Sequence, residues 1–95
     1  MTRNIMTGEG IKPVEAVTEF EVSGIKMFTY YNTEWEEWRV TEMSSGYYFP
    51  GDFDTEASAM FAAKAKIANV GPEKVMEKVR AMIARCGVAN EEAKV

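Results

Sequence analysis

The sequence predicts an α+β fold: a small antiparallel sheet of three to four strands, over about residues 17–49, followed by two helices packed on one face of it. Two observations predict this fold. Before position 50, short segments rich in aromatic and β-branched side chains alternate with a period of two, as half-buried strands do. After Thr55 the chain is rich in alanine, and apolar residues recur every three or four positions, as in amphipathic helices.

The chain of 95 residues is long enough to bury one hydrophobic core, and its apolar fraction of 46% is that of an ordinary globular protein. We therefore expect a single α+β domain over residues 14–87. Before residue 14, Gly8 and Gly10 interrupt any regular pattern of apolar and polar residues, so residues 1–13 are expected to form a flexible N-terminal arm. Residues 88–95 are expected to form a frayed C-terminal tail.

Four segments carry the strand pattern, and turn-forming residues separate them. The segment from Ile25 to Tyr31 is the clearest strand, because β-branched and aromatic residues dominate it. Pro50 and Gly51 end the last segment by removing an amide donor and offering a tight turn. The expected strands are residues 17–23, 25–31, 38–43 and 47–49.

The helices are expected over about residues 55–69 and 72–86, with Asp54 or Thr55 as the N-cap of the first. A glycine precedes Pro72, which suits the first position of the second helix because its fixed φ is already helical. The N-cap residue and the glycine–proline break therefore predict where the two helices begin.

The second helix is expected to end at Gly87, a residue suited to the left-handed stop of a helix. Its apolar stripe includes Cys86. This is the single cysteine of the sequence, so no disulfide can form within the chain. The negative end of the helix dipole opposes a thiolate there, and we expect a buried structural thiol.

Several chemistries lack the residues they need. The chain has no histidine and one cysteine, so it lacks the commonest general base and cannot assemble a zinc-binding set. The acids around Asp52 and Asp54 resemble a calcium loop, but Ala57 and Ala63 stand where the glycine and the last carboxylate would be needed. No glycine-rich phosphate loop is present. We expect a non-enzymatic protein with no cofactor and no metal.

Charge divides the chain into two unlike parts. Residues 1–58 carry eleven acidic and four basic side chains, a net charge of −7, whereas residues 59–95 carry four acidic and seven basic ones, a net charge of +3. If the two parts fold as separate layers, the molecule has an acidic sheet side and a mildly basic helix side.

Aromatic residues are concentrated in the strand region, where nine of the eleven lie between positions 28 and 53. Neighbours on a strand point to opposite faces, so Tyr30 and Tyr31 cannot both enter the same core, and some rings must face outwards or an edge. Those expected to fill the core beneath the helices, with Val40, are Phe28, Tyr30 and Trp38.

The remaining rings, together with nearby glutamates, are the candidate binding residues. Exposed Tyr and Trp are typical anchors of protein interfaces, and an acidic rim suits a basic partner such as a nucleic-acid-handling complex, where carboxylates can occupy phosphate positions. The candidate partner-binding residues are Tyr31, Glu34, Trp35, Glu36, Glu37, Glu42, Tyr47 and Asp52.

A short acidic chain with a sheet, two helices and no catalytic residues resembles the small accessory and anti-CRISPR proteins of phages and mobile elements. The segments Trp38-Arg39-Val40, Gly46 to Phe49 and Thr55-Glu56-Ala57 match no family-specific signature, so the resemblance assigns no site residues. It implies an acidic inhibitor or accessory protein that acts in counter-defence. We expect it in the cytoplasm, or in the host cell cytoplasm if a phage encodes it. The sequence has a single cysteine, and it shows no export signal and no apolar stretch long enough to span a membrane.

Three alternatives remain open. A homo-oligomeric structural or assembly protein could use an edge strand or the helix faces. A weak nucleic-acid binder could use the basic helices, although direct binding by the sheet is disfavoured, because Lys26 and Arg39 stand there among many acids. A small-ligand protein or enzyme built on carboxylates and tyrosines would need a convergent polar set, which the sequence does not display.

Overall fold

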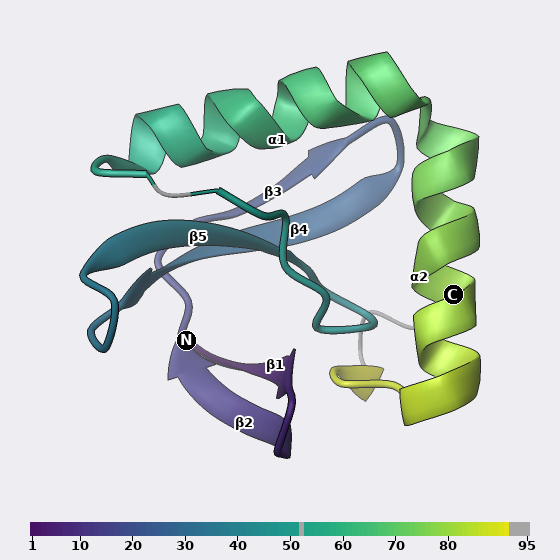
Figure 1. Ribbon diagram of the computed structural model, residues 1–95, viewed down its shortest axis with the longest axis horizontal. Helices are drawn as coiled ribbons and strands as arrows, with labels where there is room; N and C mark the ends of the chain where they lie inside the picture. The colour runs from purple at the N-terminus through teal and green to yellow at the C-terminus, as the bar shows by residue number, and fades with distance from the viewer. Residues whose placement is uncertain (52, 92–95) are drawn as a thin grey trace.

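The computed structural model describes residues 1–51 and 53–91, and it confirms the α+β fold (Figure 1). Antiparallel strands form a two-stranded and a three-stranded sheet, and two helices follow them. Neither helix is long and apolar enough to cross a membrane. The elements are β1 (Thr2–Thr7), β2 (Gly10–Glu15), β3 (Glu19–Val22), β4 (Ile25–Asn32), β5 (Glu37–Glu42), α1 (Glu56–Val70) and α2 (Pro72–Cys86).

The residues expected to form a flexible arm, 1–13, instead belong to a β-hairpin. β1 and β2 pair in register from Thr2 opposite Glu15 to Thr7 opposite Gly10, which leaves a two-residue turn at the tip. The Thr7 hydroxyl closes this turn by donating to the carbonyl of Gly10 at 2.7 Å. Gly10 has a φ of 107°, which disfavours any other residue there. The turn glycines thus end β1 and start β2.

The segment after α2 is also held by the fold, although residues 88–95 were expected to fray. The Asn90 side chain is buried and bonds to the backbone of Asn4 in β1, accepting from its amide at 2.9 Å and donating to its carbonyl at 3.0 Å. These bonds cover the outer edge of β1. Residues 92–95 of the expected tail lie outside the described residues.

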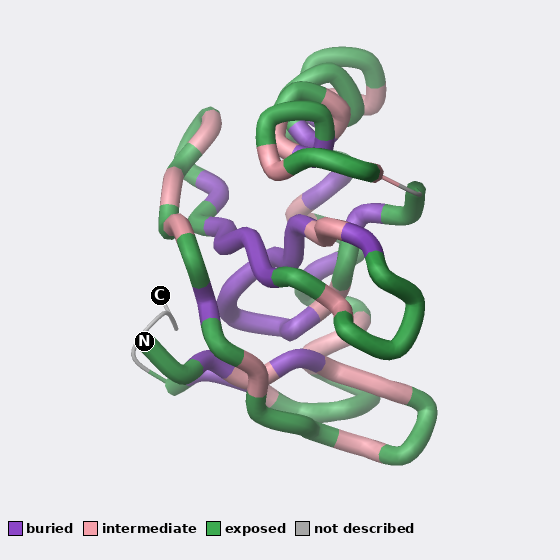
Figure 2. The backbone as a smooth tube through the Cα atoms, turned by 90° about the vertical axis from the view of Figure 1, so that its left-hand side faces the viewer, coloured by how far each residue is buried: buried purple, intermediate pink, exposed green. Residues whose placement is uncertain are grey.

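The three-stranded sheet lies between the helices and the hairpin, and the buried residues gather there (Figures 1 and 2). β4 is the central strand, and its successive residues face opposite sides. Met27 faces the helices, in a core with Ile25, Val40 and residues of α1 and α2. Phe28 faces the hairpin, in a second core with Ile5 and Met43 among others.

Two residues expected in the core beneath the helices therefore lie on the opposite face of the sheet. Phe28 and Tyr30 were expected beneath the helices, but both lie in the hairpin-side core, because side chains on a strand alternate and Met27 faces the helices. Val40 does lie on the helix side, and Trp38 packs against that core while only partly buried. The hairpin missing from the sequence prediction is what buries the second face.

α1 begins as predicted and is fastened to the sheet at its first turn. Thr55 is its N-cap and accepts from the amide of Ser58 at 3.1 Å. One oxygen of Glu56 accepts from the hydroxyls of Thr18 and Thr29, at 2.7 and 2.6 Å. These bonds place the start of α1 over the middle of β4.

Two other expectations need correction. Residues 47–49 do not form a strand; the segment runs along the outer edge of β5 and makes an isolated bridge from Tyr48 to Thr41. Cys86 is exposed and not buried. The buried residues of α2 are Val75 and Val79 in its first half, so the helix leaves the core before it reaches Cys86.

Candidate protein-binding groove

Four of the predicted binding residues come together where β4 turns into β5. Tyr31 stands near the end of β4, and Glu34, Trp35 and Glu36 lie in the turn that follows. All four are exposed: Tyr31 by 43% and Trp35 by 68% of their surface. The sequence prediction of exposed aromatic and acidic side chains therefore holds at this turn.

Side-chain hydrogen bonds order the turn. The Asn32 side-chain oxygen accepts from the amides of Glu34 and Trp35, both at 3.0 Å, as in an Asx turn. Glu36 has a φ of 52°, in the left-handed region that a residue with a side chain rarely adopts. Tyr31 packs edge-on against Trp38, with 5.5 Å between ring centroids. The exposed Trp35 ring is thus presented from a fixed backbone.

Two predicted rim residues are not on the rim. Glu37 is 6% exposed, and one of its oxygens accepts from Nη2 of Arg39 at 2.7 Å. Glu42 is 3% exposed, and its carboxylate accepts from the amides and hydroxyls of Ser44 and Ser45 at 2.6 to 3.0 Å. Both carboxylates are occupied by internal donors, so neither is available to a partner.

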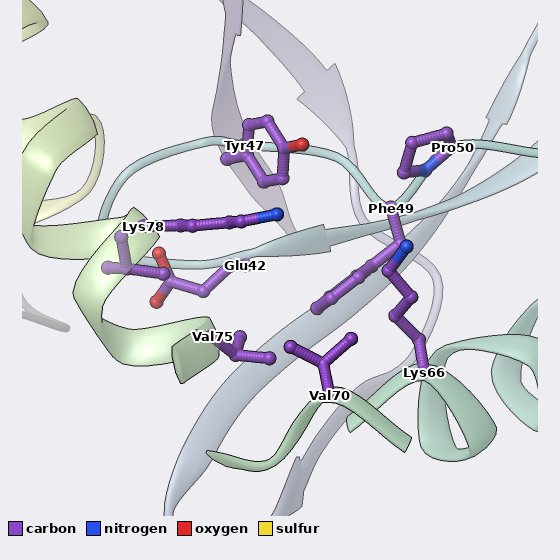
Figure 3. A pocket seen from close by; sticks show the side chains of 9 residues that line it. Glu42, Tyr47, Phe49, Pro50, Lys66, Val70, Val75 and Lys78 are labelled. Atoms are coloured by element: carbon purple, nitrogen blue, oxygen red, sulfur yellow. The ribbon is translucent and has the colours of Figure 1, made fainter. Parts of the chain in front are cut away.

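Tyr47 lies elsewhere, beside a small cavity of about 40 Å³ between the helices and the segment that follows β5 (Figure 3). Lys66 of α1 and Lys78 of α2 also line this cavity, and Lys78 lies next to the Tyr47 ring in the close-up. Such a volume holds one or two water molecules. Tyr47 therefore contributes to packing against α2. The last predicted residue, Asp52, lies outside the described residues.

A groove of about 450 Å³ opens beside the turn, and we call it the binding groove. Residues 12–15 of β2 line one side of it, and residues 30–34 line the other. A second hollow, of about 310 Å³ near the hairpin tip, shares Lys12 and Glu34 with it, so the binding groove extends towards Ile11. The sequence prediction of a flexible arm over residues 1–13 misses the β2 side; the glycines at 8 and 10, between segments that contain apolar residues, were the signal available for a hairpin.

Exposed apolar side chains gather around the binding groove. Scattered exposed apolar residues are normal, whereas a cluster beside a hollow marks a contact surface. Among the large exposed apolar residues of the described chain, Met1, Tyr48 and Phe61 line neither hollow. Those that line the binding groove or directly follow its residues are Ile11, Val17, Tyr31 and Trp35.

The charged rim of the binding groove is mainly acidic. Glu9, Glu15 and Glu34 line its two hollows, and the exposed Glu36 follows in the turn. Glu15 forms an ion pair with the N-terminal ammonium at 2.7 Å, whereas Glu9, Glu34 and Glu36 form none with another described residue. Lys12 is the basic side chain that lines the groove. Carboxylates therefore outnumber cationic groups around it, which gives a local potential that attracts cations.

Among the described residues, no three Cys, Asp or Glu side chains are grouped so that they could hold a metal ion. The chain matches no protein-family model, no curated protein and no solved structure.

Proposed function

We propose that this protein is a non-enzymatic protein-binding module, whose binding groove receives a basic segment of another protein. The observation that carries the proposal is the gathering of exposed apolar residues around one groove with a mainly acidic rim: Ile11, Val17 and Tyr31 line its two hollows, and Trp35 directly follows Glu34 in the turn beside it. Protein interfaces combine such an aromatic centre with a polar rim.

The apolar part of the surface supplies the binding free energy. Each square ångström of apolar surface removed from water contributes about 25 cal/mol. Trp35 and Tyr31 are stiff side chains on a backbone ordered by Asn32, so a partner that covers them orders few additional groups. Less of the gain is therefore lost to conformational entropy.

The acidic part selects the partner by charge. Glu9, Glu34 and Glu36 favour a segment that carries Lys or Arg, and they speed its approach at low salt. A nucleic-acid-handling complex presents such groups where it binds phosphates. On such a partner the protein would act as an inhibitor, in the manner that its resemblance to anti-CRISPR proteins implies.

The aromatic contribution is tested with Tyr31→Ser combined with Trp35→Ser, and with Phe61→Ser as the matched control. Phe61 is 75% exposed on α1, outside the groove. Proteins captured from the native cells by the wild type and by the control, and quantified by mass spectrometry, should fall at least about tenfold with the double variant. An unchanged set of captured proteins would overturn the proposal.

The charge contribution is tested with Glu34→Lys combined with Glu36→Lys. Both side chains are exposed, so the melting temperature should stay within a few degrees of the wild type, while the affinity for a captured basic partner falls and loses its dependence on salt. Affinity and salt dependence that match the wild type would show that the acids take no part.

A homo-oligomeric role is the second candidate, and one observation favours it. Phe61 projects from a face of α1 on which Ala57, Ala65 and Ala68 are also exposed, with Lys64 as the charged residue among them. Sedimentation equilibrium distinguishes the two candidates: an oligomer formed through this face should dissociate in Phe61→Ser. A wild-type monomer at concentrations up to about 100 μM would remove the second candidate.

A further inference from the structure

We infer that the partner enters the binding groove as an extended strand and pairs with the open edge of β4 at Tyr31. The inference rests on the proposed function and names the conformation in which the bound segment is recognised. It follows from the hydrogen bonds of the three-stranded sheet, which leave part of the β4 edge open in the part of the chain that the structure describes.

β3 covers only half of β4. β4 runs from Ile25 to Asn32, but the register with β3 ends at Phe28. One more residue is paired on this edge, since Thr29 accepts from the amide of Val17 at 2.9 Å and donates to the carbonyl of Thr18 at 2.8 Å. Before Val17 the chain leaves β4 and belongs to the hairpin side. The rest of this edge of β4 has no neighbouring strand among residues 1–51 and 53–91.

The alternation of antiparallel strands gives the direction of the unpaired groups. Every second residue directs its N–H and C=O to the same edge, so Tyr31 directs both towards the side where Thr29 is bonded. The other side of the sheet agrees with this. Trp38, which stands opposite Tyr31, donates its amide away from β4 to the carbonyl of Phe53 at 2.8 Å, as expected for a pair without mutual hydrogen bonds.

The other edges of the described strands are covered or interrupted. The outer edge of β1 bonds to Gly46 and Asn90, and that of β5 to the segment after it. β2 contains Pro13, which has no N–H to donate, and β3 is four residues long with two exposed glutamates. These are the usual protections against unwanted strand pairing. The edge at Tyr31 lacks such protection and opens into the binding groove.

The size of the binding groove fits a strand. Paired strands lie about 4.8 Å apart, and the binding groove offers about 450 Å³ beside this edge. A strand beside Tyr31 would direct alternate side chains towards Val14 and Tyr30, which line the groove. Apolar residues are favoured at those positions, and a Lys or Arg at the end near Glu34. Backbone bonds would give affinity and the alternate side chains specificity.

The test begins with peptides selected for affinity from a random display library on the immobilised full chain. Peptides of interest bind the wild type and Phe61→Ser equally but lose at least about tenfold in affinity for Tyr31→Ser with Trp35→Ser. Each then receives backbone N-methyl groups, one residue at a time. Strand pairing with Tyr31 requires a loss of about tenfold at the peptide residue whose amide donates to the Tyr31 carbonyl, and a smaller loss at the residues on either side of it.

Hydrogen exchange gives an independent readout on the protein itself. When the peptide is bound, the amide of Tyr31 should exchange at least about tenfold more slowly, because it donates to the peptide. If no single N-methyl position stands out and this amide is unaffected, strand pairing is wrong while the proposed function stands. If no selected peptide loses affinity for the double variant, both are overturned.

Discussion

The four glutamates between Glu34 and Glu42 are alike in sequence but opposite in their structural roles. Glu34 and Glu36 stand on the turn after β4, exposed and without an ion-pair partner among the described residues. Glu37 and Glu42, at the two ends of β5, are buried and bonded to donors of the fold. The comparison teaches that an acidic sequence segment is not an acidic surface: half of these carboxylates stabilise the fold, and the other half are available to a partner.

The largest expected effect comes from Glu42→Ala. Its removal leaves the amides and hydroxyls of Ser44 and Ser45 without their acceptor inside the protein, which should lower the free energy of unfolding by about 3 kcal/mol. Urea unfolding measures this loss. Glu34→Ala is the matched change on the turn and should stay within about 0.5 kcal/mol of the wild type. Equal losses in the two variants would contradict the comparison.

In contrast to Glu42, removing a buried polar group that has no hydrogen-bond partner should stabilise the fold. The Thr41 hydroxyl is fully buried and has no hydrogen-bond partner among the described residues. Thr41→Val keeps the shape and removes the unpaired oxygen, so it should raise the free energy of unfolding, by about 1 kcal/mol. Thermal and urea unfolding both report the change. A destabilised variant would indicate that the hydroxyl is bonded in solution.

The smallest stability effect concerns the pair of the buried Arg3 and the partly exposed Glu19, which joins the hairpin to β3. The hydrogen bond from Arg3, 2.6 Å long, lowers the pKa of Glu19. A lowered pKa adds stability that is present above the unfolded value, about 4.3, and is lost as the pH falls through the folded value. Glu19→Gln should therefore cost under about 1 kcal/mol at pH 7 and weaken the acid dependence of stability.

Its control is Glu21→Gln, an exposed neighbour on β3. Unfolding measured from pH 7 to pH 3 should follow the wild-type curve in this variant. If the two variants have the same pH dependence, the Arg3 pair does not contribute measurable stability.

Local signals in the sequence were sufficient for the helices. Thr55 as a cap, Gly71 with Pro72 between the helices and Gly87 as a stop act within a few residues of themselves, so their effects do not depend on the rest of the fold. The hairpin was missed for the opposite reason. A two-stranded ribbon gains its stability from distant residues, here Gly46 and Asn90, which no local pattern connects to it.

The residues of the candidate site divide in the same way, into those that local sequence signals identify and those that depend on tertiary contacts. Tyr31, Glu34 and Trp35 could be identified because a strand end followed by polar residues marks an exposed turn. The burial of Glu42 could not, because it depends on donors brought to it by the turn after β5. The β2 side of the groove depends on how the hairpin docks, which is also a tertiary property.

Chemical-shift mapping by NMR tests the binding groove most directly. A peptide selected only for affinity is titrated into the ¹⁵N-labelled full chain. The largest amide shifts are expected in residues 12, 14, 15 and 30–36, with little change along α1. Largest shifts on α1 or α2, with those residues unchanged, would contradict binding in the groove.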